Sequence, residues 1–287
     1  MAFGRRRSYA IGDATLVAPE NMDSFWALLV AKMATTAIIV VGASKIVERS
    51  GPFVGAMVAT LPISAGPSYV FLAAEHGGAF IERATLTSLA VNAVTFGFGA
   101  LYALLAQTRS LAVSLSVSFG LWLVAAALVV SAPWTLATAG ALNVLVFVPS
   151  FLATRVCRAT PPARAPQSRW WDIPFRAIMV MCLVGTTVAL GRFLGPAAAG
   201  VAALVPIVMF SLAVILHPRI GGPGASAVLA NTLLGLVGFG LAVAALHLTV
   251  LPFGAPLALS FALAICVGWN ASLALLRHIP LRARARR

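Results

Sequence analysis

The 287-residue chain is far more apolar than a soluble domain, with 61% hydrophobic and only 9% charged residues. Its mean hydropathy of +0.99 excludes a water-soluble globular fold and predicts an all-α protein embedded in a lipid bilayer, because helices satisfy their own backbone hydrogen bonds in lipid. A net charge of +13 would indicate nucleic-acid binding in a soluble protein, but here the basic residues fall in loops beside apolar segments. We therefore expect anionic lipid headgroups as partners and no nucleic acid.

Apolar segments of about 20 residues recur along the whole chain, and each is long enough to cross a hydrocarbon core roughly 30 Å thick. Short polar breaks separate them, so the sequence predicts a polytopic membrane protein with about nine transmembrane helices. The predicted spans are 26–48, 51–74, 80–107, 111–131, 134–155, 173–191, 195–217, 224–250 and 256–277.

These spans group into two sets of four helices with one helix between them. The predicted organisation is an N-terminal polar segment at 1–23, a first membrane repeat at 24–131, a connector helix at 132–155, a basic linker at 156–172, a second membrane repeat at 173–278 and a basic C-terminal tail at 279–287. The N-terminal segment shows no convincing small-residue cleavage site, so we do not expect a signal peptide. The three scattered cysteines indicate neither a disulfide framework nor a zinc site.

Basic residues predict the orientation of the chain in the membrane. With nine spans and the N-terminus outside, 14 of the 20 lysines and arginines fall on the cytoplasmic side, as the positive-inside rule requires. We therefore expect a multi-pass protein of the inner (plasma) membrane with its N-terminus outside and its C-terminus in the cytoplasm. The arginine triplet 5–7 opposes this orientation, and nothing in the sequence decides the oligomeric state, so a homodimer stays open.

The two sets of four helices resemble each other at a fixed offset of 144 residues. Gly-Pro at 51–52 aligns with Gly-Pro at 195–196, Pro-Ile at 62–63 with Pro-Ile at 206–207, and Gly-Gly at 77–78 with Gly-Gly at 221–222. Glycines and prolines that match at one offset indicate a duplication. Because the connector adds one crossing between the repeats, the second repeat is expected to enter the membrane upside down. Inverted repeats of this kind are common among secondary transporters.

Two prolines in the aligned segments predict discontinuous helices and a substrate site between the repeats. Pro62 and Pro206 each lie about 10 residues into a span, where proline removes a backbone hydrogen bond and frees a carbonyl at membrane depth. The polar residues Ser64, Ser68 and Tyr69 follow Pro62. The alternative is a proline kink in a packed bundle, with the serines bonded back to their own helix.

Other polar residues complete the expected set of contacts. The candidate substrate-binding residues are Pro62, Ser64, Ser68, Tyr69, Pro206, Asn92 and Asn231. The two asparagines lie within predicted spans, where hydrogen bonding between helices is the default role and substrate contact the alternative. Glu75-His76 and Glu82-Arg83 flank the glycine turn at 77–78 and are expected to form local pairs in a solvated loop.

The absence of charged residues and enzyme motifs within the predicted spans narrows the function. No carboxylate follows Asp172, and the earlier ones fall in tails, loops or span ends, which disfavours a cation exporter driven by protons or sodium. No catalytic motif, metal-ligand cluster or cofactor-binding loop is present, so we expect no enzyme activity, metal or cofactor. We expect a permease or flippase-like transporter of a small neutral, anionic or lipid-linked molecule; a non-transporting accessory subunit is the main alternative, and an intramembrane enzyme the third.

The first repeat also resembles a family of small membrane proteins. The order Gly-Pro at 51–52, Gly55, Leu-Pro-Ile at 61–63, the glycine pair at 77–78 and Arg-Ala-Thr-Leu-Thr at 83–87 resembles the GlpM-type four-helix proteins linked with alginate production. The segment 195–234 resembles a second copy, although the family's Pro-Thr is replaced here by Pro62-Ile63. The resemblance implies two fused units and an inner-membrane role near the synthesis or export of envelope polysaccharide, with the chain as an accessory subunit.

Overall fold

The computed structural model describes residues 20–49, 65–159 and 169–284, and within these residues it contains helices and no strands. The protein is an all-helical, polytopic membrane protein: seven of the described helical stretches are long and apolar enough to cross a bilayer. The helices are α1 (Glu20–Arg49), α3 (Ala65–Glu75), α4 (Gly78–Leu105), α5 (Leu111–Val130), α6 (Leu136–Ala153), α7 (Arg155–Ala159), α8 (Asp172–Leu194), α9 (Pro196–Ala202), α10 (Ile207–Phe253) and α11 (Ala255–Arg284).

One of the seven stretches contains more than one of the predicted spans. The stretch Pro196–Phe253 includes α9 and all of α10, and α10 is interrupted at Gly221, whose φ of 77° and ψ of 167° are not helical. Glycine tolerates this backbone conformation because it has no Cβ. The predicted span 51–74 is described only from Ala65 onward, as α3, so the count of seven does not decide between nine crossings and another number.

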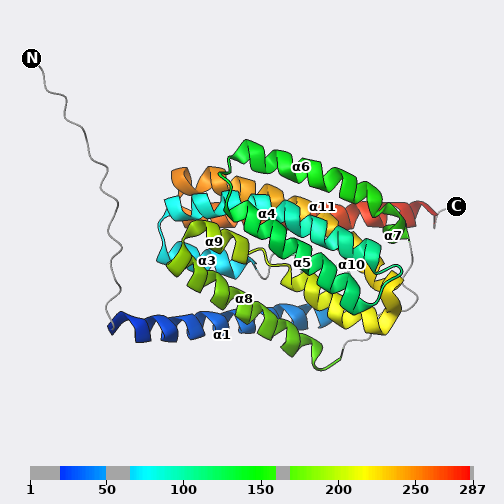
Figure 1. Cartoon of the computed structure of the whole chain (residues 1–287), viewed down its shortest axis with the longest axis horizontal. Helices are drawn as coiled ribbons and strands as arrows, with labels where there is room; N and C mark the ends of the chain where they lie inside the picture. The colour runs from blue at the N-terminus through cyan, green and yellow to red at the C-terminus, as the bar shows by residue number, and fades with distance from the viewer. Residues whose placement is uncertain (1–19, 50–64, 160–168, 285–287) are drawn as a thin grey trace, which may run out of the picture.

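The long helices run side by side along the longest axis of the molecule, with α4 in the middle of the bundle (Figure 1). Of the most apolar part of α4, 72% is buried inside the protein, against 11% for α6. The largest fully buried side chains include Phe96 and Tyr102 of α4 and Leu229 and Leu233 of α10. The core therefore forms around α4 and α10, while α6 exposes an apolar surface suited to lipid.

Helices α4 and α10 run antiparallel and contact each other reciprocally. Near the centre of α4, Asn92 donates a hydrogen bond to the carbonyl of Leu236, which lies 144 residues further along the chain. Toward one end Gly78 faces the carbonyl of Val250, and toward the other Gly222 faces the carbonyl of Ala106. Each of these two contacts becomes the other when the corresponding residues of the two helices are exchanged.

Helix starts follow the same offset. α4 begins at Gly78, directly after Gly77, and the second part of α10 begins at the corresponding position, directly after the break at Gly221. α5 begins at Leu111 and α11 at Ala255, which are again corresponding positions. The aligned glycine pairs of the sequence therefore mark the same local feature in both halves, the start of a long helix.

Candidate functional site

The predicted interruption at Pro206 is confirmed. α9 ends at Ala202, residues 203–206 are not helical, and α10 begins at Ile207 with Pro206 as its N-cap residue. At 1.5 Å per residue, α9 and the first part of α10 are about 10 and 21 Å long, so together they match one bilayer thickness with the break inside it. Proline ends helical hydrogen bonding here because it has no backbone N–H to donate.

Carbonyl groups at the break receive hydrogen bonds from side chains of α4. The Ser88 hydroxyl donates to the carbonyl of Gly200 at 2.8 Å, and the Thr95 hydroxyl donates to the carbonyl of Leu204 at 3.1 Å. Trp122 of α5 donates its indole N–H to Thr95 at 3.0 Å. In lipid an unpaired carbonyl would cost several kcal/mol, so these bonds allow the break to persist at membrane depth.

Tyr69 of α3 joins this network, and α3 thereby meets the broken element. Its hydroxyl donates to Ser88 at 2.5 Å, and its side chain is 3% exposed. Ser68 is fully buried beside it. Gly200 allows α9 to lie this close to α4, because a Cβ at that position would collide with the carbonyl of Ala84. The structure thus brings Tyr69 and the Pro206 break to the same face of α4.

Pro62 and Ser64, the other half of the predicted site, lie outside the described residues. Ser88 and Thr95 were not among the predicted site residues, although they make the decisive hydrogen bonds. Their hydroxyls carry no distinctive sequence signal, because serine and threonine within a membrane helix usually bond to their own helix.

The two predicted asparagines lie in different surroundings. Asn92 is fully buried and donates its amide to Asn143 of α6 at 3.0 Å and to Leu236 of α10 at 3.1 Å. This confirms the expected hydrogen bonding between helices, while the side-chain oxygen of Asn92 has no hydrogen-bond partner among the described residues. Asn231 donates to Ala227 of its own helix at 2.8 Å. The role of either asparagine in substrate binding stays a prediction.

Two ion pairs tie the short helical segments to the long helices α1 and α8. Lys32 of α1 pairs with Glu75 at the end of α3. Asp172 at the start of α8 pairs with Arg219 near the end of the first part of α10, with atoms 2.5 Å apart. The expected local pairing of Glu75 with His76 was wrong, because folding brings the stronger cationic partner Lys32 against Glu75 from 43 residues away.

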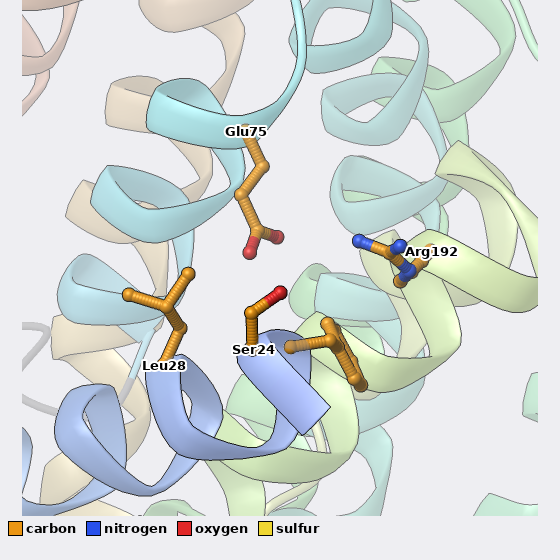
Figure 2. Close-up of a pocket in the computed structure, with 5 residues that line it drawn as sticks. Ser24, Leu28, Glu75 and Arg192 are labelled. Carbon is orange, nitrogen blue, oxygen red and sulfur yellow. The ribbon is translucent and has the colours of Figure 1, made fainter. Parts of the chain in front are cut away.

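A cavity of about 270 Å³ opens between α1, the end of α3 and the end of α8 (Figure 2). The lining residues are Ser24, Phe25, Leu28, Glu75 and Arg192. This cavity could not be predicted from the sequence, because its walls come from segments up to 168 residues apart, and only the fold brings them together.

Within the described residues, no three histidine, cysteine, aspartate or glutamate side chains are close enough to hold a metal ion. The chain matches no family model, no curated protein and no solved structure.

Proposed function

We propose that the protein is a membrane transporter, a permease or flippase-like carrier of a small neutral, anionic or lipid-linked molecule, built from two inverted repeats. The observation that carries this proposal is the reciprocal packing of α4 on α10. The contact of Gly78 with Val250 and that of Gly222 with Ala106 correspond under exchange of the two halves, and Asn92 contacts its own counterpart Leu236.

A second pair of contacts supports the same relation. His247 lies 3.0 Å from the carbonyl of Glu82, and Ser226 donates to the carbonyl of Ala103 at 2.5 Å. At the offset of 144 residues, Glu82 corresponds to Ser226 and Ala103 to His247. Exchanging the corresponding residues therefore turns one of these contacts into the other. Such pairs are expected of a two-fold axis between the two halves, and because α4 and α10 run antiparallel this axis would be perpendicular to the helices. For helices that cross a membrane, the axis then lies in the membrane plane, which is the arrangement of inverted-repeat transporters.

The helix break and the ion pairs fit a carrier that opens alternately to the two sides. The pairs Lys32–Glu75 and Asp172–Arg219 hold the short segments at opposite ends of the bundle (Figure 1). In transporters of this architecture, discontinuous helices form the substrate site near the midplane and their halves move during transport. We place the substrate site at the break before Pro206, facing Ser68 and Tyr69, and each ion pair at one of the two exits.

One observation favours a second function, that of a non-transporting accessory subunit. Tyr69, Ser88 and Gly200 fill the described side of the break and satisfy one another's hydrogen bonds. A scaffold has such a solid interior. A carrier shows it only while the site is closed, so the distinction requires a measurement of movement across the membrane.

The test uses proteoliposomes that contain this protein alone. One set carries fluorescent phospholipids, whose inward movement is read by quenching of the outer leaflet, and another set receives radiolabelled small anions from the outside. A carrier moves at least one cargo faster than empty liposomes. Arg219→Gln, which releases one of the proposed exits, should change that rate, whereas the matched surface variant Arg83→Gln should not. Failure to move any of these cargoes at a rate above empty liposomes would favour the accessory subunit.

A further inference from the structure

The cavity between α1, α3 and α8 has an unusual charge arrangement. Figure 2 shows the carboxylate of Glu75 and the guanidinium of Arg192 reaching into it from different helices, with the hydroxyl of Ser24 pointing toward the same space from α1. Glu75 is already neutralised by its ion pair with Lys32. Among the described residues Arg192 forms no ion pair, and its guanidinium lies 4.5 Å from the centre of the Phe25 ring.

Among the side chains that the structure describes, the balance of charge at the cavity is positive. Lys32 and Glu75 cancel, which leaves the single charge of Arg192. His76, next to Glu75, adds no charge near neutral pH because burial is the main cause that lowers its pKa below the ordinary 6.5. Arg192 also lies in the last turn of α8, where the helix dipole stabilises a cation, but the dipole does not explain why the guanidinium faces a hollow.

We propose that this cavity is a binding site for an oxyanion, a phosphate or carboxylate group carried by a lipid headgroup or by a small soluble molecule. Arg192 provides the charge and the planar pair of N–H donors that such groups prefer, and Ser24 lines the same opening.

The size and the apolar wall of the cavity agree with this class of ligand. About 270 Å³ corresponds to roughly nine water molecules of liquid volume, which accommodates a glycerol phosphate but not a whole phospholipid. Leu28, 58% exposed, continues the cavity toward the apolar outer surface of α1. A headgroup could therefore occupy the cavity while its acyl chains lie along α1 in the bilayer.

The experiment measures binding and does not depend on transport, so it can fail or succeed independently of the proposed function. The purified full chain is placed in phosphatidylcholine nanodiscs and titrated with glycerol 3-phosphate, glycerate and neutral glycerol. A second preparation contains phosphatidylglycerol, and native mass spectrometry counts the retained anionic lipids. Binding of the soluble anions identifies a free small molecule as the source, and retention of phosphatidylglycerol alone identifies a lipid headgroup.

Three variants assign the binding to the cavity. Arg192→Gln should weaken the bound oxyanion about 10- to 100-fold, as expected for loss of a charge-assisted hydrogen bond, and Arg192→Lys should recover part of it. Arg83→Gln, an exposed arginine whose Nε bonds its own helix at Ala79, is the matched control and should bind as the wild type does. Ser24→Trp fills the opening while leaving Arg192 in the sequence and should also abolish binding, which keeps the test informative should Arg192→Gln not fold.

Two results would overturn the proposal. One is an absence of binding by every anion and by phosphatidylglycerol in the folded wild-type protein. The other is binding that neither Arg192→Gln nor Ser24→Trp weakens relative to Arg83→Gln, because the oxyanion then binds elsewhere.

Discussion

The two corresponding glycines Gly222 and Gly78 should respond differently to the same substitution. A Cβ on Gly222 would overlap the backbone carbonyl of Ala106 and lie 3.2 Å from the His217 ring. A Cβ on Gly78 would lie 3.5 Å from the carbonyl of Val250, an ordinary van der Waals contact. Gly222→Ala must therefore push α10 away from α4, whereas Gly78→Ala needs no movement.

The magnitude follows from overpacking against a backbone that cannot rotate away. Overpacking of a filled core costs typically about 1–3 kcal/mol, while alanine is favoured over glycine within a helix by about 1 kcal/mol. We expect Gly222→Ala to lose about 1–3 kcal/mol of stability and Gly78→Ala to be neutral or to gain up to about 1 kcal/mol. At about 2–4 °C per kcal/mol for a chain of this size, the melting temperatures of the two variants should differ by several degrees.

The assay is thermal unfolding of both purified variants in one detergent, read by the loss of the monodisperse peak in size-exclusion chromatography. Since Gly78 and Gly222 occupy corresponding positions, each variant is the control for the other. Equal melting temperatures, or a lower one for Gly78→Ala, would refute the close approach of Gly222 to Ala106.

Three further outcomes follow from the described contacts. Ser88→Ala leaves the buried carbonyl of Gly200 without its donor and should lower the free energy of unfolding by about 1–3 kcal/mol in denaturant titrations; no loss would mean that the carbonyl is paired otherwise. Asp172→Asn should destabilise the protein more than Arg219→Gln, because it leaves both Arg219 and the nearby Arg176 without a carboxylate, whereas Arg219→Gln leaves Asp172 beside Arg176; equal melting temperatures would contradict this. Because burial lowers the pKa of His76 below 6.5, wild type should lose stability relative to His76→Gln as pH falls below 6.5, and parallel pH profiles would show that His76 is not buried.

Local features of the fold could be predicted from sequence because they depend on a few residues each. Proline cannot continue the hydrogen bonding of a helix, so the interruption at Pro206 could be predicted from the sequence. The glycine pair at 221–222 marked a helix start for a similar reason: Gly221 has a φ of 77°, which other residues rarely adopt. The apolar spans follow from the thickness of the bilayer.

Contacts between distant segments could not be predicted in the same way. The hydroxyl of Ser88 meets the carbonyl of Gly200 across 112 residues, and a serine within an apolar span gives no hint of its partner. From the sequence, Glu75 was also expected to pair with its neighbour His76, whereas the ion-pair partner of Glu75 is Lys32 on another helix. In the sequence, Arg192 served only as one of the basic residues that predict the orientation of the chain in the membrane. Its position in a cavity depends on three helices whose packing the sequence alone does not predict.

The inverted-repeat architecture can be tested by the sidedness of two corresponding loops. Arg109 lies between α4 and α5, and its counterpart Phe253 lies at the turn between α10 and α11. Each is replaced singly by cysteine in a background without the three native cysteines, and intact cells are treated with a membrane-impermeant maleimide before and after permeabilisation. We predict that the cysteine at 253 reacts in intact cells and the cysteine at 109 only after permeabilisation. Labelling of both from the same side would contradict inverted repeats.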